Sequence, residues 1–308
     1  MSVIFQASIR ASSVSFKAAH DMISIVSPTP DLIVTDSMMR LSGSSLEKTI
    51  FLNLFMENYN LPGFRYSSPK DLHRLSFYGG SMSSALKGIK RGKPIFIGQK
   101  EGQGICVKNS LQESSSFNII PIADPPPFAE ITEHPEIPIQ NPNIIVSLLS
   151  LKETFGSLAK GGKSSVRTGK IIMFEKGMSA VITGSDKRTK AGNSWGIVLP
   201  ETAPSRTFRL EENHIKLLSK MSTILSDGQA RIYYDIASEV PTSLRFEIAL
   251  PIGTWVVHFI EKTTSEEARD DDHGSRREAD ARDEGAEAKD EKNASDTEET
   301  EEESGDDH

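Results

Sequence analysis

The sequence contains a single cysteine, Cys106, among 308 residues, and this excludes a disulfide framework. It also lacks any run of about 18 apolar residues, which excludes an ordinary membrane-spanning helix, and its first residues lack the layout of a secretory signal. We therefore expect an intracellular protein in a reducing compartment. Cys106 lies between Ile105 and Val107 in an alternating pattern, so we expect it to fill a strand.

Signatures of catalysis and metal binding are also missing. The seven histidines are scattered, and none pairs with a cysteine or another histidine at ligand spacing. The run Gly156–Ser164 resembles a phosphate-binding loop, but five residues in place of four precede its Gly-Lys-Ser. It also ends a predicted helix, whereas a phosphate loop begins one. We expect no enzyme, no catalytic residue, no cofactor and no metal.

Charge divides the chain into two parts. Residues 263–308 carry 20 acidic and 6 basic residues, a net charge of −14, against −8 for the whole chain, so residues 1–262 carry +6. The tail has no aromatic residues and cannot bury a core, so we expect Thr263–His308 to be disordered. The body that precedes it is mildly basic.

Apolar periodicity predicts many short strands and four helices in residues 1–262. The stretch Arg231–Lys262 alternates throughout and predicts a three-strand meander, with turns at Pro241 and at Pro251–Gly253. Further strands are predicted over Val3–Ile9, Leu32–Thr35, Met38–Leu41, Thr49–Met56, Ile95–Ile97, Gly104–Lys108, Phe117–Ile122, Ile144–Leu149, Lys170–Glu175, Met178–Thr183, Ser194–Leu199 and Arg206–Leu210.

The helices are predicted over Val14–Val26, Gly80–Arg91, Ser150–Gly161 and Glu211–Leu225. Ser150 and Glu153 form a capping-box pattern at the start of the third helix. The residues expected to face the core are Val14, Ala18, Met22, Ile25 and Val26 in the first helix, Met82, Leu86 and Ile89 in the second, and Leu217, Leu218, Met221 and Leu225 in the fourth.

The order of elements repeats once along the chain. Residues 1–123 and 144–262 each read as strand, helix, strands, helix, strands, so we predict two similar domains. Residues 124–143 join them as a proline-rich connector, which cannot be a central strand or a helix interior. This connector nevertheless carries Phe128, Ile131 and Ile137, which a plain spacer does not need.

This element order, the connector and the final strands resemble the sliding clamp family of DNA polymerase processivity factors, of the proliferating cell nuclear antigen type. The resemblance implies an α+β fold of duplicated clamp domains, with antiparallel sheets outside and helices lining the central hole of a three-subunit ring. It implies a homotrimer that encircles duplex DNA in the nucleus or at a site of viral DNA replication. The expected partners are a DNA polymerase, a clamp loader and other clients with short peptide motifs, and no membrane. The divergence and the tail suggest a large DNA virus as the source.

Basic residues occur on or just after all four predicted helices of a body with net positive charge. For any one of them, a solvated helix surface is an equally good explanation. The resemblance implies that these helices face DNA, where lysines contact phosphates without reading sequence. The candidate DNA-binding residues are Lys17, Lys87, Lys90, Arg91, Lys152, Lys160, Lys163, Lys216 and Lys220.

The resemblance also implies a groove for client peptides beside the connector. The segment LSGSSL, residues 41–46, looks like the family's Met-Asp-Ser-Ser-His-Val, and His258 stands where the family usually has tyrosine. For Leu41 and Leu46, packing in the core is the open alternative. The candidate groove residues are Leu41, Leu46, Phe128, Ile131, Ile137, Pro241 and His258.

Two other interpretations remain. A checkpoint-type clamp subunit has the same fold but assembles with unlike subunits, and an acidic-tailed histone chaperone would bind basic proteins through its tail. For the homotrimer, we expect Ser194–Leu199 of one subunit to pair with Ser115–Ile119 of the next, because edge strands seek partners.

Overall fold

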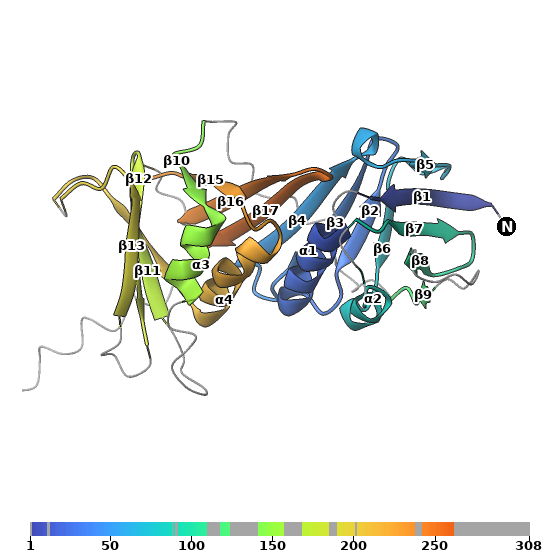
Figure 1. Ribbon diagram of the computed structural model, residues 1–308, viewed down its shortest axis with the longest axis horizontal. Coiled ribbons are helices and arrows are strands. Elements are labelled where there is room, and N and C mark those ends of the chain that lie inside the picture. Colours follow the sequence, from blue (N-terminus) through green and yellow to red (C-terminus); the bar gives the residue numbers. More distant parts are fainter. Residues whose placement is uncertain are drawn as a thin grey trace, which may run out of the picture. The chain divides into compact units, whose positions relative to one another are not determined.

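The computed structural model describes residues 2–10, 13–87, 89, 92–109, 118–123, 141–156, 168–184, 190–200, 202–237 and 242–261 (Figure 1). Residues Met1–Thr263 form one compact unit, and Thr264–His308 form a second unit that lies outside the described residues. The predicted domain limits at residues 123, 143 and 262 stay predictions.

The first half of the body contains nine strands and two α-helices within its described residues. They are β1 (Val3–Ile9), α1 (Ser13–Val26), β2 (Asp31–Val34), β3 (Met38–Ser44), β4 (Ile50–Glu57), β5 (Arg65–Tyr66), β6 (His73–Ser76), α2 (Gly79–Ala85), β7 (Ile95–Lys100), β8 (Ile105–Asn109) and β9 (Asn118–Ile120), with a short 3₁₀ turn, η1, at Asn58–Asn60.

The second half follows the same plan. Its elements are β10 (Ile144–Ser147), α3 (Leu148–Gly156), β11 (Thr168–Phe174), β12 (Gly177–Thr183), β13 (Lys190–Gly196), β14 (Arg206–Leu210), α4 (Glu212–Lys220), the 3₁₀ turn η3 (Met221–Thr223), β15 (Gln229–Tyr234), β16 (Ser243–Leu250) and β17 (Gly253–Ile260). The predicted meander is therefore confirmed as β15–β17.

Sheet topology shows that the two halves are repeats. The first half contains the strand order β1-β7-β8-β9, and the second half contains β10-β15-β16-β17. The other sheet order, β4-β3-β2-β6, corresponds to β13-β12-β11-β14. All of these pairings are antiparallel, so the predicted duplication of an antiparallel α+β unit is confirmed.

The halves are joined through β4 and β17, which merge two four-stranded sheets into one of eight strands (Figure 1). Leu54 of β4 lies opposite Trp255 of β17, and both side chains are fully buried. Helix α1 also contacts α4, and the Ser15 hydroxyl donates a 2.7 Å hydrogen bond to the Ile224 carbonyl just beyond η3. The two repeats thus share a sheet and a buried polar contact.

Helix α1 shows where the predicted core face is wrong. Val14 and Ile25 are exposed, whereas Phe16, Ala19 and Ile23 are buried together with the correctly predicted Met22. The sequence 13–26 is apolar over much of its circumference, so periodicity alone leaves the orientation of the helix ambiguous. In α2 and α4 and directly after them, the predicted core residues Met82, Leu86, Leu217, Leu218 and Met221 are buried.

Several predicted boundaries are also wrong. Helix α3 begins at Leu148, and Ser150 lies inside it; the Ser147 hydroxyl accepts a hydrogen bond from the Leu149 amide at 3.3 Å. Serine at the helix start satisfies an amide that has no helical partner, so Ser147 does what was predicted for Ser150. Strand β13 ends at Gly196, before the predicted Ile197–Leu199, and α2 ends at Ala85.

Candidate nucleic-acid interface and partner groove

The four helices form one continuous row. Helix α1 contacts α2 on one side and α4 on the other, and α4 in turn contacts α3. In Figure 1, α3, α4, α1 and α2 follow one another along the molecule in that order. Any basic side chains on their exposed sides therefore lie on one row of neighbouring helices, although the helices come from both halves of the sequence.

Three of the candidate lysines lie on the adjacent helices α3 and α4. Lys152 is exposed on α3, and Lys216 and Lys220 are exposed one turn apart on α4. The opposite side of α4 is apolar and buried through Ile215 and Leu218, which fixes the lysines toward solvent. Helix α4 is held at its start by a capping box, in which the Glu211 amide donates to Nδ1 of His214 at 3.0 Å.

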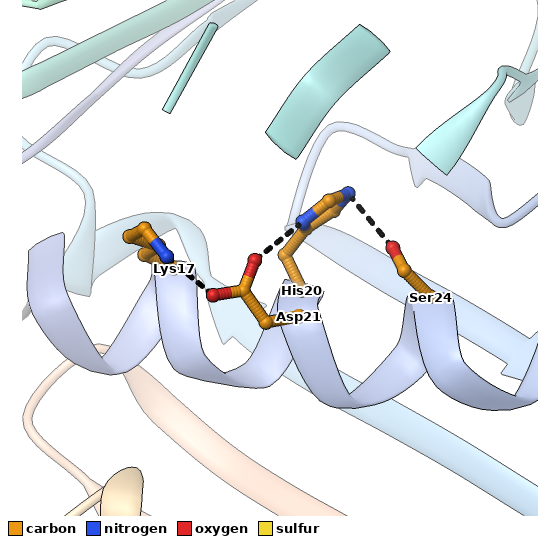
Figure 2. Close-up of polar contacts among 4 residues, drawn as sticks. All are labelled: Lys17, His20, Asp21 and Ser24. Carbon is orange, nitrogen blue, oxygen red and sulfur yellow. Dashed lines mark hydrogen bonds and ion pairs between the residues drawn. The ribbon is translucent and has the colours of Figure 1, made fainter. Parts of the chain in front are cut away.

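Lys17 on α1 differs, because it is engaged with a neighbour. Its Nζ forms an ion pair with Asp21 one turn away, and both side chains are partly exposed (Figure 2). His20 is fully buried and places Nδ1 3.6 Å from the other Asp21 oxygen, while its Nε2 lies 3.3 Å from the Ser24 hydroxyl. The ring of His20 also stacks on Phe77 at 6.2 Å between centroids.

This arrangement acts on the Asp21 carboxyl. Partial burial raises its pKa, but hydrogen bonds from His20 and Lys17 and the Lys17 charge outweigh burial, so the pKa is lowered below the usual 3.8. Asp21 therefore stays ionised and offsets the charge of Lys17. Spacing of Lys17 and Asp21 at i, i+4 was the sequence signal for this pair.

The remaining candidates divide between exposed and undescribed positions. Lys87 is exposed in the turn after α2, where its amide donates to the Ser84 carbonyl. Lys90, Arg91, Lys160 and Lys163 lie outside the described residues. Chemically, a row of exposed ammonium groups on helices can neutralise phosphates of a polyanion and release counterions, without distinguishing bases.

The structure separates the two leucines predicted for the peptide groove. Leu41 alternates inward on β3 and is fully buried in the core, so it has no surface to offer a peptide, and its assignment to the groove is corrected to core packing. Leu46 is 95% exposed at the tip of the β3–β4 connection. The Ser45 hydroxyl accepts from the amides of Thr49 and Ile50, both at 3.1 Å, and this orders the loop that displays Leu46.

His258 lies on the junction strand β17, between Arg245 of β16 and Phe51 of β4. Its side chain is fully buried, and its ring is 6.4 Å from that of Phe51. It therefore offers no exposed wall to a peptide in this structure. Phe128, Ile131, Ile137 and Pro241 lie outside the described residues, so their predicted part in a groove stays a prediction.

Exposed apolar side chains occur on or beside β9 and β13, each of which lies at one end of its sheet. Ile119 lies on β9, and Ile197, Val198 and Leu199 follow β13; all four are exposed. Sequence reasoning assigned Ser194–Leu199 to an edge strand but did not foresee that its apolar residues come after the strand. The available signal was that Ile197, Val198 and Leu199 are consecutive apolar residues directly before Pro200.

No group of three or more histidine, cysteine or acidic residues could hold a metal ion among the residues described. Within the same residues, no helix is long and apolar enough to cross a membrane.

Comparisons with known proteins identify the fold. No protein-family model and no curated protein matches the chain by sequence. By structure, the chain is similar to the crystal structure of proliferating cellular nuclear antigen from Entamoeba histolytica, with a TM-score of 0.61 and 12% sequence identity. The match covers 85% of this chain and 100% of that chain. The predicted fold class, α+β with duplicated clamp domains, is confirmed, and at this identity the likeness shows the fold alone.

Proposed function

We propose that the chain is a sliding-clamp subunit, of which three copies close head to tail into a ring around duplex DNA. The ring tethers a DNA polymerase, is opened by a clamp loader, and recruits further clients through short peptide motifs. It performs no chemistry itself. It works in the nucleus or at a site of viral DNA replication.

The observation that carries this proposal is the junction between β4 and β17. Strand β4 of the first repeat occupies the same place in its sheet as β13 of the second. In the same way, β9 of the first repeat is equivalent to β17 of the second. The chain pairs β4 with β17 internally, and within the described residues it leaves β13 and β9 at sheet ends. Pairing β13 of one copy with β9 of the next would repeat the internal junction, and repetition of that step is a head-to-tail assembly.

The internal junction also predicts the register of the external one. Val257 of β17 lies opposite Leu52 of β4. Val257 pairs with Phe246 of β16, and Asn118 pairs with Val107 of β8, the equivalent strand of the first repeat. Val257 and Asn118 therefore occupy equivalent positions. Likewise, Leu52 pairs with Gly43 of β3, and Ala191 pairs with Ile182 of the equivalent strand β12, so Leu52 and Ala191 occupy equivalent positions. Asn118 of one copy is therefore expected opposite Ala191 of its neighbour.

Crosslinking tests this register. In a Cys106→Ser background, Asn118→Cys with Ala191→Cys should give covalent trimers when treated with a short bismaleimide. The matched control combines Asn118→Cys with Gln229→Cys, because Gln229 is exposed on β15, which has strand partners on both sides. Equal crosslinking of the two pairs, or a monomer mass in light scattering at micromolar concentration, would contradict the ring.

Pairing β13 of one copy with β9 of the next would also bring helices of the two copies together. Inside the chain, α1 of one repeat contacts α4 of the other. The corresponding helices across the proposed junction are α3 of one copy and α2 of the next. The row of helices would thus continue around the ring and present Lys87, Lys152, Lys216 and Lys220 to the enclosed duplex.

Topological retention tests encirclement. Clamps loaded on nicked circular plasmid should stay bound at a salt concentration that strips free protein, and linearisation should release them, because only a ring depends on closed DNA. With a loader supplied, this chain should suffice as the only clamp subunit, which separates a homotrimer from a checkpoint-type clamp that needs unlike subunits. Equal retention on both DNA forms would favour simple charge attraction.

A further inference from the structure

The sheet β1-β7-β8-β9 carries a hollow on the side that faces away from the helices. Helix α2 contacts β8 and β9 through the buried side of this sheet. The opposite side bears a cavity of about 720 Å³, lined by Phe96, Gly98, Cys106 and Ile119 among others. Phe96 is 39% exposed and Ile119 60% exposed. This volume lies within the range of about 300–1,000 Å³ that is typical of ligand pockets.

The second repeat explains why the hollow exists. Phe96 pairs with Lys108 and Gly98 with Cys106, just as Arg231 pairs with Glu247 and Tyr233 with Arg245. The five outward positions Phe96, Gly98, Cys106, Lys108 and Ile119 therefore correspond to Arg231, Tyr233, Arg245, Glu247 and His258.

In the second repeat, three of these positions are filled by side chains that contact one another. Arg245 forms an ion pair with Glu247, and its guanidinium lies 5.9 Å from the centre of the Tyr233 ring. The first repeat has glycine where Tyr233 would stand and a small thiol where Arg245 would stand. Gly98 also lies where a Cβ would come within 2.8 Å of the Phe5 carbonyl, so a larger residue requires a backbone shift.

The hollow has one sign of charge. Among the described residues that line it, Arg10, Lys100 and Lys108 are basic and none is acidic. The centre is apolar, so an occupant needs an apolar or aromatic group to fill it and negative charge around that group to meet the rim.

We propose that this hollow, defined by Phe96, Gly98, Cys106, Ile119 and the rim residues Arg10 and Lys100, is a second docking site for partner proteins. Its ligand is a short extended segment with an apolar or aromatic anchor flanked by carboxylates. Because the site lies on the opposite side of the sheet from α2, a partner can occupy it while the helices face DNA. The inference rests on the hollow alone and does not require a ring.

Two other occupants fit less well. The chain's own tail, residues 263–308, supplies carboxylates but contains no aromatic, leucine, isoleucine, valine or methionine residue that could act as the anchor. A single-stranded nucleic acid matches the basic rim, but such binding uses successive aromatic platforms, and Phe96 is the only aromatic residue with an exposed side chain among the described residues that line the hollow.

Fluorescence polarisation with a designed probe tests the site. The probe is a short labelled peptide with a central Phe-Leu pair flanked by glutamates. Two matched peptides replace the pair by Ala-Ala or the glutamates by lysines, and both should bind at least about tenfold more weakly. Phe96→Ala, which removes the aromatic contact without changing the charge around the hollow, should weaken the probe by a similar factor. The matched control Ile145→Ala truncates an exposed strand residue of the second repeat and should leave binding unchanged.

The only cysteine serves as a reporter for the same site. Burial raises the pKa of the Cys106 thiol, partly offset by Lys100, so alkylation is best followed at mildly alkaline pH. Saturating probe should slow alkylation of Cys106 at least about fivefold if it binds the hollow, and the lysine-flanked peptide should not. This readout separates the hollow from any groove near Leu46, which lies elsewhere on the chain.

Three outcomes would overturn the proposal. One is probe binding that Phe96→Ala leaves intact, provided the variant melts at the wild-type temperature. Another is equal protection of Cys106 by single-stranded DNA, which would make the hollow a nucleic-acid site. The last is probe binding seen only after deletion of residues 263–308, which would show that the tail occupies the hollow. Protection and loss of binding together, in the full chain, support the docking site.

Discussion

The two repeats share their strand order and their paired registers but differ in their outer sheet surfaces. In the second repeat, Tyr233, Arg245 and Glu247 cover the surface with their own contacts. In the first, Gly98 and Cys106 leave a hollow beside Phe96. Backbone pairing and core packing thus recur, whereas outward side chains do not, because only the inward ones must fill a shared interior. The difference between the two outer surfaces is the basis of the docking site proposed for the first repeat.

Two strands of the second repeat also differ in how their edges are satisfied. Strand β17 is covered on both sides by β16 and β4, whereas β13 is paired with β12 alone within the described residues. The chain's two tryptophans, Trp255 and Trp195, lie on these two strands. They therefore allow a direct comparison of a closed junction with an open edge.

The largest effect is expected from Trp255→Ala at the closed junction. Trp255 is fully buried against Leu54, so its loss should lower the free energy of unfolding by about 3–5 kcal/mol. Trp195→Ala should cost only about 1–2 kcal/mol, because Trp195 is half-buried, stacks on Phe155 and donates one hydrogen bond to Ser150. Urea denaturation followed by circular dichroism measures both.

Trp255→Phe is the control for this comparison. It keeps most of the packing and removes an indole N–H that has no hydrogen-bond partner among the described residues. Its cost should stay below about 1.5 kcal/mol. Similar losses from the two alanine variants would mean that the edge strand is as firmly held as the junction.

A smaller difference is expected between the basic helices of the two repeats. The logarithm of the DNA-binding constant falls linearly with the logarithm of the salt concentration. Replacing Lys152, Lys216 and Lys220 by alanine should make this slope shallower by about 0.9 for each phosphate that is no longer neutralised. Replacing Lys17 and Lys87 should change it less, because Lys17 is paired with Asp21. Salt titrations of affinity for duplexes of two unrelated sequences measure both sets. A change confined to one sequence would argue against phosphate binding.

The smallest effect concerns Asp21 itself. Asp21→Asn should lower the free energy of unfolding by about 0.5 kcal/mol at pH 7, since the pair with Lys17 is partly exposed. The pKa of Asp21 is lowered in the folded state, so its stabilising contribution is present above the usual value of 3.8 and disappears as pH falls through the lower folded value. Denaturation of both proteins at pH 7 and pH 3 checks the sign.

Asp71→Asn is the matched control, because Asp71 is exposed in a loop. It should leave the free energy of unfolding unchanged at both pH values. If the difference between wild type and Asp21→Asn instead grew below pH 4, hydrogen bonds to a protonated carboxyl would have to explain it.

Much of the fold could be predicted because period-two apolarity is strong where one sheet face is buried. Arg231–Lys262 is an example, and β15–β17 fall largely within it. Helix α1 was harder, since its apolar residues surround most of the helix and its true core face includes His20. The start of α3 was misplaced because serines occur at both Ser147 and Ser150, and only the fold decides which one meets a free amide.

Less of the candidate site could be predicted from the sequence. Exposed lysines such as Lys216 could be identified from helical spacing, but which helices adjoin one another depends on the sheet that unites the halves. Leu41 and Leu46 lie in one short segment and have opposite environments, because strand alternation ends at the loop. The hollow beside Phe96 has no linear signal, since it arises from small residues on two strands.

The junction between β4 and β17 has a consequence for synthesis on the ribosome. Strand β4 ends at Glu57, and its partner β17 begins at Gly253, nearly 200 residues later. At about 5–20 residues per second, the pairing edge of β4 emerges about 10–40 s before β17 is made. Because the edge of β4 stays unpaired for this time, it can pair with the same edge of another nascent chain on a polysome. We expect a truncated chain ending before β17 to require a chaperone or to aggregate, although it contains an entire repeat.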